Sequence, residues 1–297
     1  MRIATVSQNG SPFVALESEG QYFRWNEIYP EAAANSVAEL IRVGGLQRPV
    51  PDLSTVRPVE EPYEILAPLP RPARDLICLG KNFVAHAEEY DRGMGTTPGS
   101  PDDAPIVFAK AASSVCGPYS ELTIDSTVTE AVDYEVELAV VIGTGGRNIP
   151  ADAAYEHVVG YTVLNDLTAR DLQRRHQQWF LGKSLDGFGP MGPVLVTADE
   201  IPHPEKLKLT CTVDGELRQS ATVADMVVDI PQMIALVSSL MTLNPGDILA
   251  MGTPEGVGIG FDPPRYLVDG SVVVAGIDAI GELRTRIRTT GGLAESA

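Results

Sequence analysis

The sequence of 297 residues predicts a β-rich mixed α+β fold. Apolar runs with strand character recur along most of the chain, whereas helical patterns are few and short. The strand runs do not alternate regularly with helices, which favours a β-roll or a sandwich over a doubly wound parallel sheet. Hydrophobic residues make up 44% of the chain and charged residues 21%, a balance typical of a globular protein that can bury such a core.

Residues 1–70 are predicted to form a small N-terminal α+β domain, and residues 71–297 a larger second domain. The chain opens with the short alternating runs RIATV, FVALE and QYFRW, which are separated by turn signals and predict β-hairpins. Apolar residues at helical spacing predict a helix over 32–42. The stretch 48–74 is rich in proline and is typical of an extended connector.

The second domain begins with a buried strand, DLICLG, followed by a polar segment at 82–93 that is predicted to be helical. Helices are also expected over 151–158, 167–174 and 229–240, the last with an Asp cap and a proline in its first turn. Segment 91–104 is rich in Gly, Pro and Asp, and we expect it to act as a mobile lid. Further strands are expected in the runs PIVFA, VELAVVIG, VVGYTVLND, PVLVT, LKLTCTVDG, DILAMG and SVVVAGI.

The chain is strongly acidic, with 22 Lys and Arg residues against 40 Asp and Glu residues and a formal net charge of −18. Such a surface repels phosphate groups, so nucleic acids and anionic membranes are excluded as general partners. A small anionic substrate must therefore be attracted by a local cluster of cations or by a metal.

Three cysteines, Cys78, Cys116 and Cys211, are far apart and form no CxxC motif, so the sequence indicates neither a disulfide framework nor a zinc site. The chain does not open with a basic segment followed by a long apolar one, and no run of 18 apolar residues occurs. These observations predict a cytoplasmic protein.

The segment VDYEVELAVVIG, residues 132–143, carries three carboxylates at alternate positions. In a strand, Asp133, Glu135 and Glu137 would share one face, where they repel one another unless a cation compensates them. Taken alone, the pattern fits a solvated strand face equally well. The other interpretation is a site for a hard divalent ion, which binds carboxylate oxygens.

Asp166 makes the metal site the better interpretation. It ends the apolar run VVGYTVLND, and a polar helix that carries Arg170 and Gln173 follows. With Glu135 and Glu137, Asp166 supplies three oxygen ligands and leaves positions for water and substrate. This ligand set suits Mg²⁺ or Mn²⁺, with Ca²⁺ also compatible, and does not suit zinc.

Three further segments hold residues with catalytic chemistry. GKNFVAHAEEY places His86 three residues before Glu89, so that the carboxylate can orient the imidazole of a general base; a surface histidine on a charged helix is the alternative. GKSLDGFGPMGP places Lys183 in a Gly-rich loop, where an ammonium can hold a carboxylate or stabilise an enolate. The glycines of GTPEGVGIG allow a ligand to approach the backbone beside Thr253.

In their order, these motifs resemble those of the fumarylacetoacetate hydrolase family, and the resemblance covers about residues 75–290. The motifs that carry it are GKNFxxHxEE, PIVFAK, DYEVELAVVIG, GYTVLNDLTARDLQ, GKSLDGFGPMGP and GTPEGVG. The resemblance implies the family's C-terminal β-roll, a homodimer and a divalent metal in the roll. The chain is most similar to the shorter bacterial branch, whose members act on acylpyruvates or on intermediates of aromatic catabolism.

The resemblance also implies a role for each site residue. The expected metal ligands are Glu135, Glu137 and Asp166. The expected catalytic residues are His86 and Glu89, which activate water, and Lys183, which stabilises an oxyanion. The expected substrate contacts are Arg170, Gln173 and Thr253. One position departs from the family pattern, because Leu79 replaces the additional metal-binding Asp that fumarylacetoacetases carry before the catalytic His.

We expect a divalent-metal-dependent hydrolase that cleaves a C–C bond of an acylpyruvate, a 2,4-dioxo acid such as fumarylpyruvate, in the catabolism of aromatic compounds. The same site would stabilise an enolate in other reactions. A decarboxylase or isomerase of an unsaturated 2-hydroxy dioate of the homoprotocatechuate type, or an oxaloacetate decarboxylase, is therefore the alternative. A non-catalytic binding protein that keeps the roll and the metal is a third interpretation.

Overall fold

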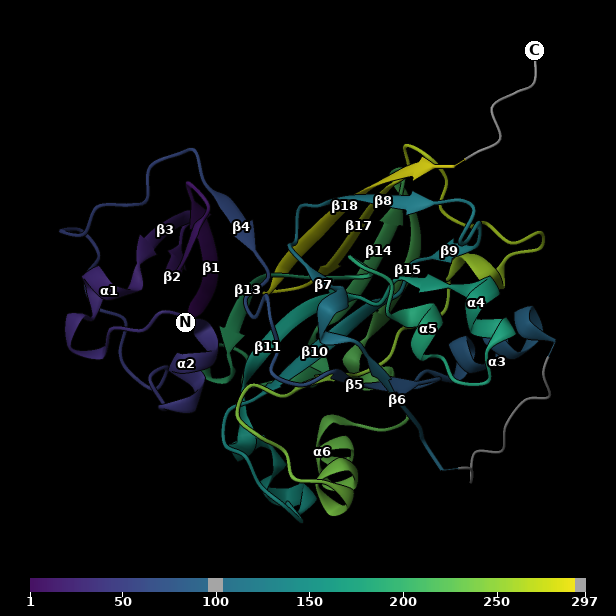
Figure 1. The fold of residues 1–297 in the computed structure, drawn as a ribbon. Coiled ribbons are helices and arrows are strands. Elements are labelled where there is room, and N and C mark those ends of the chain that lie inside the picture. The colour runs from purple at the N-terminus through teal and green to yellow at the C-terminus, as the bar shows by residue number, and fades with distance from the viewer. Residues whose placement is uncertain (96–103, 292–297) are drawn as a thin grey trace.

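The structure, a computed structural model, describes residues 1–95 and 104–291. A large mixed sheet, a five-stranded sheet and a two-stranded ribbon form most of it, and short helices lie around them (Figure 1). The expectation of a β-rich mixed α+β fold is confirmed.

The large sheet follows the order β3–β2–β1–β13–β11–β10–β16–β5–β6, with β4 beside β1 and β7 beside β13. Its strands are β1 (Arg2–Gln8), β2 (Ser11–Ser18), β3 (Gln21–Arg24), β4 (Glu64–Leu66), β5 (Leu76–Gly80), β6 (Ile106–Lys110), β7 (Val115–Cys116), β10 (Val136–Ile142), β11 (Val158–Asn165), β13 (Gly189–Thr197) and β16 (Ile248–Ala250).

The second sheet follows the order β15–β14–β17–β18–β8, and the ribbon pairs β12 with β9. The strands of the second sheet are β8 (Glu121–Asp125), β14 (Lys208–Val213), β15 (Glu216–Thr222), β17 (Val272–Ile277) and β18 (Gly281–Thr290). The strands of the ribbon are β9 (Val132–Asp133) and β12 (Thr168–Ala169).

The helices are short and peripheral. The α-helices are α1 (Trp25–Ile28), α2 (Val37–Arg42), α3 (Val84–Met94), α4 (Arg170–Arg175), α5 (Phe180–Lys183) and α6 (Ile230–Leu240). The 3₁₀ turns are η1 (Pro30–Ala32), η2 (Ala112–Ser114), η3 (Ala151–His157), η4 (Ala198–Glu200), η5 (Pro204–Lys206), η6 (Val223–Asp225) and η7 (Gly258–Gly260). No helix among the described residues is long and apolar enough to cross a membrane.

Strand β10 separates two hydrophobic cores, and all of its residues are buried. Because successive side chains point to opposite faces, Val136 and Leu138 pack in the core shared with the second sheet. Ala139 and Val141 pack in the other core, together with the N-terminal strands and helices. By the same alternation, Glu137 is on the face of β10 that carries Ala139 and Val141. A carboxylate therefore lies at one end of an otherwise apolar, fully buried face.

The first 70 residues continue the large sheet. Strand β1 pairs with β13 through Arg2 with Val196 and Ile3 with Leu195, and this part of the chain lies at the left of Figure 1. One hydrophobic core contains side chains from before and after residue 70, so the two predicted domains share this core. The division at residue 70 stays a prediction.

The segment predicted as one strand, 132–143, is interrupted after Asp133. Strand β9 pairs with β12 in the ribbon, with Asp133 opposite Thr168, and β10 starts afresh at Val136 beside β11. The expectation that Asp133 shares a face with both glutamates was therefore wrong, because the strand alternation does not run through the break.

Other bounds also differ from the predicted ones. The helix predicted over 167–174 begins at Arg170, since the two residues before it belong to β12. The segment 151–158 is a 3₁₀ turn rather than an α-helix, and the helix predicted over 32–42 occupies Val37–Arg42. The predicted helix at 229–240 is confirmed as α6, which Asp229 caps by accepting a hydrogen bond from the Gln232 N–H at 2.8 Å.

Asn82 anchors the start of α3 to the rest of the fold. Its buried side-chain amide donates hydrogen bonds to the carbonyls of Val228 at 2.9 Å and Met251 at 2.8 Å. Its oxygen accepts one from the Val228 N–H at 2.7 Å. One side chain thus joins the loop before α3 to the loop before α6 and to the end of β16.

The substitution Asn82→Ala should lower the free energy of unfolding by roughly 1–3 kcal/mol or more, because it leaves buried backbone groups without partners. Urea unfolding would measure this loss. The matched control is the exposed Asn35→Ala, which should stay within about 0.5 kcal/mol of the wild type. Equal midpoints for Asn82→Ala and Asn35→Ala would show that the Asn82 contacts contribute no stability.

Candidate active site

Three carboxylates meet where β10 begins and β11 ends. The antiparallel register places Val136 opposite Asn165, and the Asp166 N–H donates to the Glu135 carbonyl at 2.8 Å. As a result, Glu135, Glu137 and Asp166 each place a carboxylate oxygen within 4.8 Å of the others, and all three are buried. The structure thus brings together the three predicted metal ligands, which we call the carboxylate triad.

Buried cations surround two members of the triad. Lys183 Nζ lies 2.6 Å from Glu135 Oε2 and 2.6 Å from Asp166 Oδ2. Arg170 Nη2 lies 2.7 Å from Glu135 Oε1, and Lys110 Nζ lies 2.8 Å from Asp166 Oδ1. Lys183 was expected in a Gly-rich loop, but it is the last residue of α5. The helix ends at Lys183, and the Gly-rich segment follows it.

The cations affect the titration of Glu135 and Glu137 in opposite ways. Burial disfavours the charged form of Glu135, but Lys183 and Arg170 outweigh burial and lower its pKa to about 2. For Glu137, burial and the neighbouring Asp166 and Glu135 carboxylates raise the pKa well above its usual range. Glu137 is therefore the carboxylate of the triad whose charge is least compensated.

His86 and Glu89 both lie on α3, one turn apart. His86 is buried, which excludes the solvated surface histidine, and its Nδ1 lies 3.5 Å from Glu89 Oε2. Glu89 also accepts hydrogen bonds from the Gly256 N–H at 3.0 and 3.1 Å. A Cβ at Gly260 would lie 1.8 Å from Glu89 Oε1, so this side chain needs the glycine-rich turn to take up its position.

Arg170 and Gln173 lie one turn apart on α4. Arg170 Nη1 donates to Gln173 Oε1 at 3.1 Å, and Arg170 Nε donates to Asp133 Oδ2 at 2.8 Å. Burial opposes the charge of Arg170, yet Asp133 and Glu135 raise its pKa above the usual value. Arg170 is therefore a fixed positive charge beside the triad.

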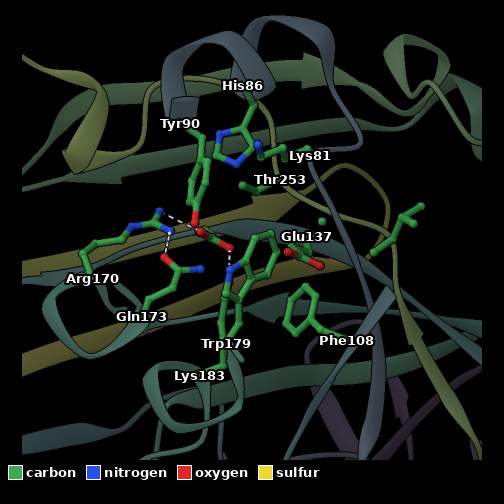
Figure 2. A pocket seen from close by; sticks show the side chains of 13 residues that line it. Lys81, His86, Tyr90, Phe108, Glu137, Arg170, Gln173, Trp179, Lys183 and Thr253 are labelled. Atoms are coloured by element: carbon green, nitrogen blue, oxygen red, sulfur yellow. Dashed lines mark hydrogen bonds and ion pairs between the residues drawn. The ribbon is translucent and has the colours of Figure 1, made fainter. Parts of the chain in front are cut away.

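These side chains surround one small cavity of about 10 Å³ (Figure 2). The predicted site residues other than Glu89 and Asp166 line it, and so does Leu79 at the position that departs from the family pattern. Trp179, Tyr90 and Phe108 form its aromatic side. Of the predicted lid, segment 91–104, residues 96–103 lie outside the described residues.

Comparison with known proteins settles the family. The model of the family "Fumarylacetoacetate (FAA) hydrolase C-terminal" matches residues 75–288. The chain belongs to this family. The sequence is 49% identical to "Oxaloacetate tautomerase YisK" of Bacillus subtilis over 221 residues, which cover 74% of this chain and 72% of that protein.

Two solved structures of the same family resemble the whole chain. A fumarylacetoacetate hydrolase from psychrophilic Exiguobacterium antarcticum is 38% identical, with a TM-score of 0.86 over 98% of this chain and 100% of that one. A maleylpyruvate hydrolase from Sphingobium sp. SYK-6, in complex with manganese(II) and pyruvate, is 28% identical, with a TM-score of 0.77 over 97% and 99% of the two chains. The protein is therefore a fumarylacetoacetate hydrolase-family enzyme.

The residues of this family member fit a divalent metal. Among the contacts of the described residues, Glu137 receives one backbone hydrogen bond, from the Gly252 N–H at 2.9 Å, and no ion pair. The buried cluster contains Asp133, Glu135, Glu137, Asp166, Lys110, Arg170 and Lys183. Its formal charge is −1 when all are ionised, and a divalent ion would make it +1. Oxygen-only ligands are those that Mg²⁺ and Mn²⁺ prefer.

Sequence reasoning misplaced one residue that builds the site, Asp133, and missed two others, Lys110 and Gln219. Asp133 accepts hydrogen bonds from the N–H groups of Gly258 at 2.6 Å and Ile259 at 3.0 Å, besides holding Arg170. Lys110 closes the PIVFAK motif, but its charge alone gave no sign of burial beside Asp166. Gln219 links Val136 to the turn at Thr253, and nothing in its sequence neighbourhood signalled this role.

Mn²⁺ should raise the melting temperature of the wild type, since a ligand bound only by the folded state stabilises it by about 2.7 kcal/mol at a hundredfold excess over Kd. Glu137→Gln should be at least as stable as the wild type without metal, because glutamine keeps this side chain neutral, the form that burial and the neighbouring carboxylates favour for Glu137. The same variant should gain little from Mn²⁺. Differential scanning calorimetry with and without Mn²⁺ measures both effects.

The control for this experiment is Glu88→Gln on the exposed face of α3, which should keep the full Mn²⁺ shift. A Glu137→Gln protein that gains as much as the wild type would argue against a metal at the triad.

Proposed function

We propose that the protein is a divalent-metal-dependent enzyme that interconverts the enol and keto forms of a four-carbon 2-oxo dicarboxylate, with oxaloacetate as the substrate. The observation that carries this proposal is the small size of the cavity. Its free volume is about 10 Å³, far below the range of ligand pockets, which favours a short substrate over a longer acylpyruvate. The name of the Bacillus subtilis relative, an oxaloacetate tautomerase, supports the same choice.

The charges around the cavity suit this chemistry. A divalent metal at Glu135, Glu137 and Asp166 would supply positive charge beside the 2-oxo oxygen, where an enolate develops its negative charge. Arg170 keeps the surroundings of the triad cationic, and the Gln173 amide beside it can orient the substrate carboxylate. Lys183 holds Glu135 and Asp166 in place and adds to the field that stabilises the enolate.

His86 is the proposed acid–base group. In the keto-to-enol direction it accepts a proton from carbon 3, and a proton is added to the 2-oxygen. In the reverse direction the 2-oxygen loses its proton and His86 returns one to carbon 3. Glu89, fixed by the Gly256 N–H, orients the imidazole for both steps.

Hydrolysis of an acylpyruvate such as fumarylpyruvate is the second candidate function, and the His86–Glu89 pair favours it. Glu89 Oε2 lies 3.5 Å from His86 Nδ1, close enough to orient an imidazole that would activate water. The maleylpyruvate hydrolase structure with manganese and pyruvate supports this candidate. A role in aromatic catabolism would go with this candidate and not with the proposed oxaloacetate tautomerase. Decarboxylation of oxaloacetate, or isomerisation of an unsaturated 2-hydroxy dioate, would use the same stabilised enolate.

Three assays run in parallel test the proposal, each with an EDTA control. They follow the ketonisation of enol-oxaloacetate, the release of pyruvate from oxaloacetate, and the cleavage of acetylpyruvate and fumarylpyruvate. We expect chelator-sensitive ketonisation to be the fastest reaction. Faster cleavage of the acylpyruvates would overturn the proposal in favour of the hydrolase, and faster release of pyruvate would identify a decarboxylase.

His86→Gln should lower kcat of ketonisation by about 10²- to 10⁴-fold, the usual contribution of a general acid or base, while the fold and Mn²⁺ binding are retained. The control is His203→Gln, which changes an exposed histidine. Wild-type rates in His86→Gln would exclude this residue as the acid–base group.

We also propose that the chain forms a homodimer through the edge of the large sheet at β6. This strand ends the described sheet, and Ile106 and Val107 on it are 39% and 41% exposed. Sedimentation equilibrium should give twice the chain mass of 31.7 kDa, and Val107→Lys should favour the monomer. Val268→Lys, at an exposed valine on another surface, is the control. A wild-type monomer at all concentrations would refute the proposal.

A further inference from the structure

We infer that Trp179 limits the chain length of the substrates that fit the cavity. Its ring closes the aromatic side of the cavity. The inference rests on the proposed function, since it takes the ligand to be a 2-oxo acid held at the triad. Trp179 lies between α4 and α5, so the same short stretch of chain carries Gln173, Trp179 and Lys183 to the cavity. Its indole is therefore placed by the elements that carry the charged side chains.

Three aromatic rings from separate parts of the chain form this side of the cavity. The Trp179 ring lies 5.6 Å from the Tyr90 ring on α3 and 5.1 Å from the Phe108 ring on β6, between centroids. Figure 2 shows Trp179 between the other two. Moving the indole would break both contacts, which are of the tilted and edge-on kind that aromatic pairs prefer. We call Tyr90, Phe108 and Trp179 the aromatic wall.

The aromatic wall lies close to the charged groups. Lys183 Nζ is 5.1 Å from the centroid of Phe108, and Arg170 Cζ is 5.9 Å from the centroid of Tyr90. Both cations are bonded to Glu135, so the triad and the aromatic wall face each other across a narrow space.

The backbone supports the indole from its other side. A Cβ built on Gly80, at the end of β5, would lie 2.5 Å from Trp179 Cζ3 and 2.9 Å from Cη2. The ring edge therefore lies directly against the backbone, and it cannot retreat in that direction to admit a longer substrate. Trp179 is fixed on the sides of Tyr90, Phe108 and Gly80, and so it acts as a size limit.

The test measures the binding of straight-chain 2-oxo acids to the full chain with Mn²⁺, by isothermal titration calorimetry. The probes are pyruvate, 2-oxobutanoate, 2-oxopentanoate and 2-oxohexanoate. The wild type should bind the shorter acids best and lose affinity as the chain lengthens. In Trp179→Ala the vacated space should reverse the trend, with affinity rising roughly fourfold for each added methylene that becomes buried.

Two further variants complete the series. Trp179→Phe keeps an aromatic ring in the wall and should move the preferred chain length by less than Trp179→Ala does. It also provides the test if the alanine variant does not fold. Phe180→Ala is the matched control, because Phe180 is the adjacent aromatic residue, is exposed and does not line the cavity. It should keep the wild-type profile.

The outcomes separate the inference from the proposed function. If the wild type binds pyruvate with Mn²⁺ while both Trp179 variants keep its chain-length profile, Trp179 is not the size limit and the proposed function stands. If the wild type binds none of the acids with Mn²⁺ but ketonises enol-oxaloacetate, the inference fails alone. If it does neither, the proposed function fails as well. A shift in both Trp179 variants that Phe180→Ala does not share supports the inference.

Discussion

A buried excess of negative charge is the constraint on which the site depends. An ionised carboxylate in the protein interior is costly unless cations or hydrogen bonds compensate it. Lys183 and Arg170 compensate Glu135, and Lys110 compensates Asp166, whereas the described contacts of Glu137 are limited to one backbone hydrogen bond. The triad thus suits one more cation. A divalent cation bound there would make the buried cluster positive and suited to an anionic substrate in a protein that is acidic as a whole.

The fold keeps these charges in place through side chains that lie behind the cavity. Gln219, on β15 of the second sheet, accepts a hydrogen bond from the N–H of Val136, the residue between the two glutamates of the triad. Its amide donates to Thr253 Oγ1 at 2.8 Å and to the Pro254 carbonyl at 2.7 Å. One buried side chain therefore couples the second sheet to the triad and to the glycine-rich turn. A shift of Gln219 would change its contacts with Val136 and Thr253.

The sequence predicted what depends on local periodicity and missed what depends on long-range packing. Glu135 and Glu137 were found because alternate carboxylates in the expected strand would share one face, and α6 because its apolar residues follow an Asp cap and a proline. Asp133 was misplaced because the strand breaks after it, and pairing with a segment more than thirty residues away causes that break. Lys110 and Gln219 were missed because only the folded chain makes them buried, and their partners lie far along the sequence.

On the proposed function, the room left in the cavity would decide between the reactions that one stabilised enolate allows. Hydrolysis requires a water molecule between His86 and the distal carbonyl of the substrate, whereas tautomerisation requires only that His86 exchange a proton with the substrate itself. The triad lies on one side of the cavity and the ring of Trp179 on the other. A longer acyl chain between them would occupy the position that this water needs. On the two proposals, the size limit at Trp179 and the choice of reaction at His86 would be one property of the site. A variant that enlarges the cavity should favour hydrolysis at the expense of proton transfer.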